Sequence, residues 1–437
     1  MALTKGNMVF RPGGSNNNPG YWNTAGTGTN YSNQDAAQIS LSGNVSSDAA
    51  GTTIAVTGSL LSSAIVGNGF QVTGAGTGLT LGTYEIKTYV DANTFTIDRS
   101  AGSSKSGGTG YIGGARALFT NSYLSSAVAG MNIYSKTGTY NVTEAINFTA
   151  AGSNTDPIRF IGFTTTPGDV CNGDNRPVIN MGAYSFATYS NNFIYDENMV
   201  FTGTAAEMRN DQSGAFNIIN CSYTNTSVTA DRKALYVSGV WGDGEEIECV
   251  STNGYGMYIP QNGCDVKRAT CRDSKYGAYV GGNYFVNFNN CVFDTCSTAG
   301  IYSDGFYVKL ANNTFYNCGD GFYNSSTNGQ GIGFVGNIFA NCTDGIHFSN
   351  NTYIRSHIQR DNNFYGNTND VTNYTKEPTA LALDPQFVDA AGGDFRVGEN
   401  MVLTKKTPNG VDYSYTLGAI PYYATAGGGT ISYGRVS

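Results

Sequence analysis

Two segments decide the fold: residues 312–321, NNTFYNCGDG, and residues 336–345, GNIFANCTDG. They share one pattern. In both, the final glycine begins a triplet that consists of a small residue, an apolar residue and a residue with a ring. A repeat of about 22 residues is too short for two packed helices, but it holds three short strands with their turns, which predicts a parallel β-helix. The triplet recurs at spacings of 22, 21, 23, 21 and 24 residues: Ala234-Leu235-Tyr236, Gly256-Met257-Tyr258, Gly277-Ala278-Tyr279, Gly300-Ile301-Tyr302, Gly321-Phe322-Tyr323 and Gly345-Ile346-His347.

Two further columns run in the same register. In a β-helix such columns become ladders, with equivalent residues roughly 4.8 Å apart on consecutive coils. The cysteines in them are then expected to fill the core as small hydrophobic residues, and no metal site is predicted, because paired ligand spacings are lacking. The first column is Cys249, Cys271, Phe293, Phe315, Phe339 and Phe364, and the second is Thr252, Ser274, Cys296, Cys318, Cys342 and Asn367.

The two deciding segments resemble repeats of right-handed parallel β-helix proteins. Residues 129–140, ending in Gly-Thr-Tyr, resemble the start of such helices, and residues 384–396 resemble their end. The resemblance implies an all-β chain with a right-handed parallel β-helix over residues 115–372. A capping helix is expected at residues 115–129 and a C-terminal cap or tail at residues 373–437. Residues 1–114 contain no cysteine and many turn clusters, which predicts a separate β-rich N-terminal domain.

Three N-terminal motifs resemble those of bacteriophage virion proteins: residues 31–37 (YSNQDAA), 94–99 (TFTIDR) and 107–114 (GGTGYIGG). This resemblance implies a structural component of the particle: a tail fibre, a tailspike or a head-surface protein. The N-terminal domain would attach to other virion proteins, and the β-helix would project as a rigid rod. We expect a homotrimer that assembles in the host cytoplasm, which agrees with free thiols and with the absence of an N-terminal signal-peptide pattern.

An outward aromatic column is the most suggestive surface feature. Strand alternation points the middle residue of each triplet to the core and its neighbour outward. Such a column can contact another subunit or pack under a loop, which we favour, or it can bind glycan. Its members are Tyr236, Tyr258, Tyr279, Tyr302, Tyr323 and His347.

Acidic residues supply the weak candidates for catalysis. Asp320 and Asp344 occupy equivalent positions on adjacent coils, as a glycosidase acid and nucleophile would, although Asp-Gly is also an ordinary turn dipeptide. Asp243, Glu245 and Glu246 crowd beside Trp241, which suits either a sugar site or a solvated acidic loop, and we favour the loop. No cofactor is predicted.

Charge and composition narrow the function further. The net charge of −8 argues against nucleic acid as a partner, and no apolar stretch is long enough to insert into a membrane. Motifs expected of pectate lyases and polygalacturonases are absent from the sequence. We therefore predict a non-enzymatic virion protein used for adhesion to host-surface glycan or for particle decoration. The alternative is a tailspike depolymerase, either a glycoside hydrolase or a polysaccharide lyase.

Overall fold

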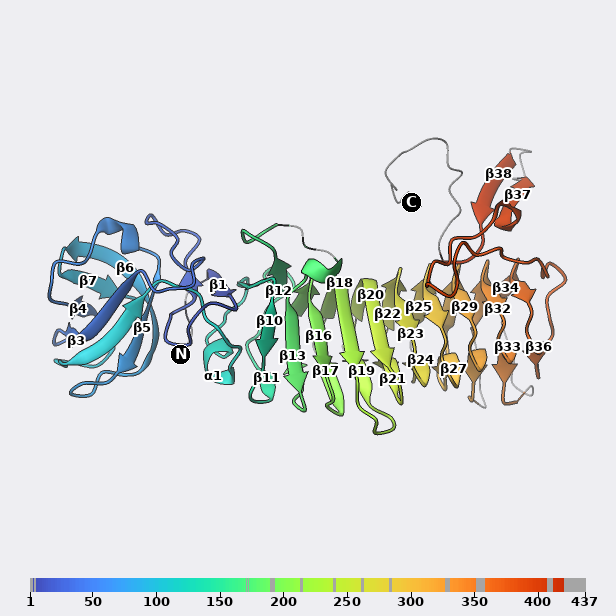
Figure 1. Cartoon of the computed structure of the whole chain (residues 1–437), viewed down its shortest axis with the longest axis horizontal. Helices are drawn as coiled ribbons and strands as arrows, with labels where there is room; N and C mark the ends of the chain where they lie inside the picture. Colours follow the sequence, from blue (N-terminus) through green and yellow to red (C-terminus); the bar gives the residue numbers. More distant parts are fainter. Residues whose placement is uncertain are drawn as a thin grey trace.

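The computed structural model describes residues 3, 5–169, 171, 173–188, 193–212, 215–238, 241–260, 263–282, 285–326, 331–350, 358–406 and 412–419. Figure 1 shows a small barrel at one end, joined to a long rod of stacked strands, with a C-terminal segment folded back along the far part of the rod. No helix among the described residues has the length and apolarity to cross a membrane.

The N-terminal barrel has its own core. Its strands close in the order β3-β4-β7-β6-β5-β8, with antiparallel pairing throughout. Alternating apolar residues of these strands, such as Phe70, Tyr84 and Phe95, meet in a cluster separate from that of the rod. The barrel strands are β3 (Ile39–Ser47), β4 (Thr53–Ala55), β5 (Gly69–Gly74), β6 (Gly82–Asp91), β7 (Thr94–Ile97) and β8 (Gly108–Ile112), with a 3-10 turn, η1, at Ser63–Ile65.

The segment before the barrel belongs to the rod, so residues 1–114 do not form the single domain that the sequence predicts. Strand β1 (Asn7–Phe10) pairs in parallel with β9, the first strand of the rod, and β2 (Tyr21–Trp22) pairs antiparallel with β1. The reason is burial: Phe10 is fully buried, and its ring stacks on Phe119 at 4.2 Å. The leader therefore covers the open end of the rod's core.

The predicted capping helix over residues 115–129 is wrong in extent, because helix α1 spans only Asn121–Leu124. Residues before it extend alongside β1 instead: the Arg116 backbone N–H donates to the Val9 carbonyl at 3.0 Å. The short helix buries Tyr123 and Leu124 in the rod's core. Capping is thus shared between one helical turn and the leader strand.

The rod is the predicted parallel β-helix, and this fold class is confirmed. Each coil contributes one strand to each of three parallel sheets, and long strands β18 and β20 run through two of them. The first sheet contains β9 (Asn132–Lys136), β12 (Ile158–Phe163), β15 (Phe193–Glu197), β18 (Ala215–Asn225), β20 (Trp241–Ser251), β22 (Gly263–Lys267), β25 (Val286–Asn289), β28 (Val308–Ala311), β31 (Gly333–Val335) and β34 (Ile358–Arg360). The second contains β10 (Thr139–Asn141), β13 (Val178–Gly182), β16 (Val200–Gly203), β18, β20, β23 (Thr270–Arg272), β26 (Val292–Asp294), β29 (Thr314–Tyr316), β32 (Ile338–Ala340) and β35 (Asn363–Tyr365). The third contains β11 (Ile146–Phe148), β14 (Phe186–Thr188), β17 (Glu207–Asp211), β19 (Lys233–Val237), β21 (Tyr255–Ile259), β24 (Tyr276–Val280), β27 (Ala299–Ser303), β30 (Asp320–Asn324), β33 (Asp344–Phe348) and β36 (Asn369–Thr372).

Single left-handed residues bend the chain from sheet to sheet. In one coil these are Asn312, at φ +52°, before β29, and Asn317, at φ +50°, after it. Asparagine tolerates this region better than most residues with a side chain, which explains the recurring asparagines of the repeat.

The predicted ladders form inside the rod. Phe315 stacks on Phe293 at 5.0 Å and on Phe339 at 4.7 Å, and Phe339 stacks on Phe364 at 5.2 Å. All nine cysteines are free and buried. A further buried ladder of amides runs from Asn313 through Asn337 and Asn362, with side-chain hydrogen bonds of 3.0 and 2.9 Å between successive members.

The C-terminal segment packs on the outside of the second sheet. Val397, Met401 and Leu417 bury themselves against Ile338 of β32. A 3-10 turn, η3 (Glu399–Met401), leads into the hairpin of β37 (Val402–Lys406) and β38 (Asp412–Thr416); another, η2, lies at Gly173–Asn175. The candidate functional site lies on the outer face of the third sheet.

Candidate functional site

The outward aromatic column lies on the outer face of the third sheet. Its residues are register partners on consecutive strands, from Tyr236 on β19 to His347 on β33. The middle residue of each triplet, such as Ile301, is fully buried, whereas the column residues are half-buried. This is the alternation that the sequence predicts.

The rings of this column lie face to face. Tyr258 stacks on Tyr236 at 5.4 Å and on Tyr279 at 4.5 Å, and Tyr279 stacks on Tyr302 at 5.6 Å. Tyr323 is tilted by 42° from Tyr302. Both faces of Tyr258 and Tyr279 are therefore covered by neighbouring rings, so a sugar cannot stack on them. The column offers ring edges and phenolic oxygens to the solvent.

A second outward column lies beside the first, and sequence reasoning missed its aromatic part. Tyr255 stacks on Tyr276 at 4.9 Å, and both contact the first column edge-on. In register, this column continues through Ala299 to Asp320 and Asp344. The same spacing of about one coil could have found it, because Tyr255 and Tyr276 each stand three residues before a tyrosine of the first column.

The two columns bring three titratable side chains together at one end of the tyrosines. Asp320 on β30 and Asp344 on β33 are register partners. His347 Nδ1 lies 3.3 Å from Asp320 Oδ2 and 3.8 Å from Asp344 Oδ2, and the His347 ring meets Tyr323 edge-on at 4.9 Å. Thr372 Oγ1 donates a hydrogen bond of 2.5 Å to Asp344 Oδ1. The sequence placed the carboxyl groups together, but it did not connect His347 with them.

This cluster is mostly covered and holds a proton readily. The side chains of Asp320, Asp344 and His347 are 18%, 12% and 27% exposed. The pKa of Asp320 is raised to about 6: burial is the main cause, the nearby His347 partly offsets it, and the charge of Asp344 adds to it. Asp320 can therefore stay protonated in mildly acidic solution and still face a solvent-exposed edge.

The same three side chains can also hold a metal ion. One ligand atom from each of Asp320, Asp344 and His347 lies within 4.8 Å of the others. Two carboxylate oxygens and an imidazole nitrogen suit several divalent transition metals. The sequence predicted no metal site, because paired ligand spacings are lacking and the repeat assigns His347 to the aromatic column.

The acidic group near Trp241 does not form one site. The side chain of Trp241 lies outside the described residues. Glu245 and Glu246 form ion pairs with Arg268, the latter at 3.2 Å, whereas Asp243 lines a separate pocket on the first sheet. The Glu245 and Glu246 carboxylates thus belong to a surface ion-pair group.

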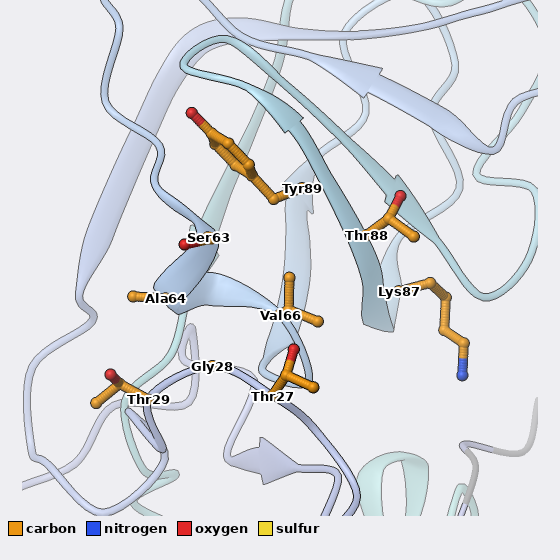
Figure 2. A pocket seen from close by; sticks show the side chains of 9 residues that line it. All are labelled: Thr27, Gly28, Thr29, Ser63, Ala64, Val66, Lys87, Thr88 and Tyr89. Atoms are coloured by element: carbon orange, nitrogen blue, oxygen red, sulfur yellow. The ribbon is translucent and has the colours of Figure 1, made fainter.

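The barrel carries a hollow of about 540 Å³ between the leader and β6. Figure 2 shows Tyr89 and Lys87 on β6, with the Lys87 side chain extending away from Tyr89 and Ser63. Lys87 forms an ion pair with Glu85 at 3.0 Å. The lining offers hydroxyl groups but no pair of acid and base.

The fold and the site define a parallel β-helix protein with paired carboxyl groups on the outer face of one sheet. No protein-family model matches the chain, and no curated protein matches it.

Solved structures similar to the chain include polysaccharide lyases. A mutant of the family-6 alginate lyase AlyGC has 17% identity and a TM-score of 0.38, over 59% of this chain and 38% of that one. The pectate lyase Pel9A has 14% identity and a TM-score of 0.43, over 69% and 90%. A mannuronic-acid-specific family-6 lyase from human gut microbiota has 13% identity and a TM-score of 0.36, over 57% and 72%. The chain thus spans well under half of the first of these proteins.

Proposed function

We propose that this protein cleaves a polysaccharide by hydrolysis at Asp320 and Asp344. The observation that carries the proposal is the pair of carboxyl groups on adjacent coils, of which Asp320 has a pKa raised to about 6. A glycosidase needs one carboxyl group that is protonated and one that is ionised. Such an activity is that of a depolymerase, the alternative that the sequence leaves open.

The short separation of the two carboxyl groups favours a covalent intermediate over an inverting mechanism. Retaining glycosidases place their carboxyl groups about 5–5.5 Å apart. Here the two carboxyl groups are closer still, because an oxygen of Asp320 and an oxygen of Asp344 lie no more than 4.8 Å apart and the two side chains share a hydrogen bond, which is too close for the roughly 6.5–9.5 Å of an inverting pair. Asp320 would give its proton to the glycosidic oxygen as that bond breaks, and Asp344, oriented by Thr372, would attack the anomeric carbon. Asp320 would then take a proton from the water that releases the sugar from Asp344.

Elimination is the competing reaction, and the same cluster could supply its parts: His347 as a base, and a cation held by the two aspartates. A polysaccharide lyase needs a base and a cation that neutralises the sugar carboxylate. Among the residues that the structure describes, no lysine or arginine forms an ion pair with Asp320 or Asp344.

The test is a polysaccharide panel treated with the full-length protein at pH 5 and pH 8. We expect new reducing ends without the ultraviolet absorbance of an unsaturated sugar, and more product at pH 5 than at pH 8. Asp320→Asn should abolish the product. Unsaturated products, or equal activity of Asp320→Asn, would contradict hydrolysis at this pair. If every neutral, amino-sugar and acidic polymer of the panel stays uncut, the enzymatic proposal fails.

A second candidate is a non-enzymatic component of a virus particle, as the N-terminal motifs imply. One structural observation is compatible with it: the barrel has a core separate from that of the rod, as an attachment domain would have. In this case the barrel would attach to other virion proteins. Deleting residues 39–112 while keeping β1 should leave a folded rod that no longer enters particles. Incorporation of this variant into particles would contradict the role of the barrel.

A further inference from the structure

A pocket of about 400 Å³ lies on the first sheet, apart from the carboxyl pair of the third sheet. Its polar lining is a ladder of register partners on consecutive strands, from Tyr195 on β15 to Asn287 on β25. The pocket combines polar groups along its floor with aromatic rings. The ladder consists of Tyr195, Asn217, Asp243, Asp265 and Asn287.

Two aromatic residues of the lining are available to a ligand. Phe285 is 50% exposed, and its ring is held by stacking on Tyr307 at 4.6 Å. Tyr195 stands at the opposite end of the ladder, where Arg159 lies over its ring at 5.3 Å. Unlike the tyrosines of the third sheet, these two rings are separated by the polar floor. Such a mixture of a few aromatic rings with amide and carboxylate groups is typical of saccharide pockets.

The floor carries an arrangement that is unfavourable without a ligand. Asp243 and Asp265 are direct register partners, and like charges opposite one another destabilise a sheet. On the same two strands, the register partners Glu245 and Lys267 have opposite charges. Asp265 accepts a hydrogen bond of 2.5 Å from Asn287, and neither aspartate forms an ion pair within the described part of the chain.

We propose that this pocket binds a saccharide that donates hydrogen bonds, and that it prefers an amino sugar to a uronic acid. The two carboxylates accept hydrogen bonds from hydroxyl or ammonium groups, and an ammonium group would relieve their repulsion. A uronate would add a third negative charge. The inference goes beyond the proposed hydrolysis, because this pocket lies on another sheet and uses none of the same residues.

The experiment is a binding titration of the full-length protein, in the presence of a chelator, with glucosamine, N-acetylglucosamine and galacturonic acid tetramers. We expect the glucosamine tetramer to bind most tightly and the galacturonic acid tetramer not to bind. Asp265→Asn should weaken glucosamine binding by about fivefold or more, because a partly exposed charge contact is lost. Glu245→Gln, on β20 but outside the lining, is the matched control and should bind like the parent.

A second variant separates loss of the pocket from loss of the fold. Phe285→Ala removes an exposed ring, so it should keep the parent's circular dichroism and thermal midpoint but lose affinity for the glucosamine tetramer. Asp320→Asn should bind as the parent does, which distinguishes this pocket from the hydrolytic site. Equal binding of the uronic acid tetramer, or unchanged binding by both variants, would overturn the proposal, and so would saturation by calcium ions without sugar binding in a parallel titration from which the chelator is left out.

Discussion

Replacing Asp320 with asparagine should remove cleavage and at the same time stabilise the protein at neutral and alkaline pH. The pKa of Asp320 rises from 3.8 to about 6 on folding, chiefly because burial disfavours the ionised carboxyl group. Above pH 6 the native state therefore carries a charge that is more costly than in the unfolded chain. Asparagine has nearly the same shape without that charge.

The sign and size follow from proton linkage. Between pH 4 and pH 6 the native state binds more protons at Asp320 than the unfolded state does, so the stability of the parent falls as pH rises through this window. A shift of about 2 units corresponds to about 3 kcal/mol, and screening at this partly solvated edge reduces it to about 1 kcal/mol. Below pH 4 the carboxyl group is protonated in both states, and the difference disappears.

The measurement is urea unfolding at pH 4 and pH 8, followed by circular dichroism. Asp320→Asn should unfold at a higher urea concentration than the parent at pH 8 and at a similar one at pH 4. Asp294→Asn is the matched control: burial also raises the pKa of Asp294, but this residue lies on the second sheet. It should gain stability at pH 8 without loss of cleavage. An Asp320→Asn protein that is equally stabilised at both pH values, or not at pH 8, would refute the reasoning.

Three further predictions concern the ladders of the core. Asn337→Ala should lower the free energy of unfolding by about 3 kcal/mol, because several buried partners in the amide ladder lose their hydrogen bonds; in the same denaturation assay the exposed Asn369→Ala should have little effect. Phe315→Leu should cost about 1–2 kcal/mol, since it loses stacking on both sides, and a variant as stable as the parent in thermal unfolding would contradict the ladder. Burial raises the pKa of the Cys318 thiol well above its usual value, so a thiol reagent at pH 8 should label it only after urea is added.

The periodic part of the fold could be predicted because each coil has the same packing requirements as the next. A residue of one coil packs against its equivalents on the next, so Phe293, Phe315 and Phe339 reveal a ladder in the sequence alone. The leader strand could not be found in this way. Asn7 pairs with Asn132, and nothing in the four residues of β1 repeats elsewhere or indicates a partner so distant in sequence.

Part of the candidate site could also be predicted from the repeat. Register alone placed Asp320 beside Asp344 and Tyr258 beside Tyr279. It did not show that the tyrosine rings would close their faces against one another, because ring orientation depends on side-chain torsions that the repeat does not encode. It also did not bring His347 to the carboxyl groups, since that contact runs diagonally between two columns.

Most rungs of this β-helix stack side chains that stabilise one another. Phenylalanine meets phenylalanine and asparagine meets asparagine, and the charged register partners Glu207 and Lys233 form an ion pair at 2.9 Å. Among the described rungs of the three parallel sheets, two carboxylate pairs depart from this rule: Asp320 with Asp344, and Asp243 with Asp265. Each pair lies on an outer face of the rod, where repulsion between the two carboxylates opposes the favourable packing of the side chains around them. Such repulsion weakens the folded state, so stability does not explain the residues of these two rungs. A bound ligand, or a proton that takes part in a reaction, explains them better.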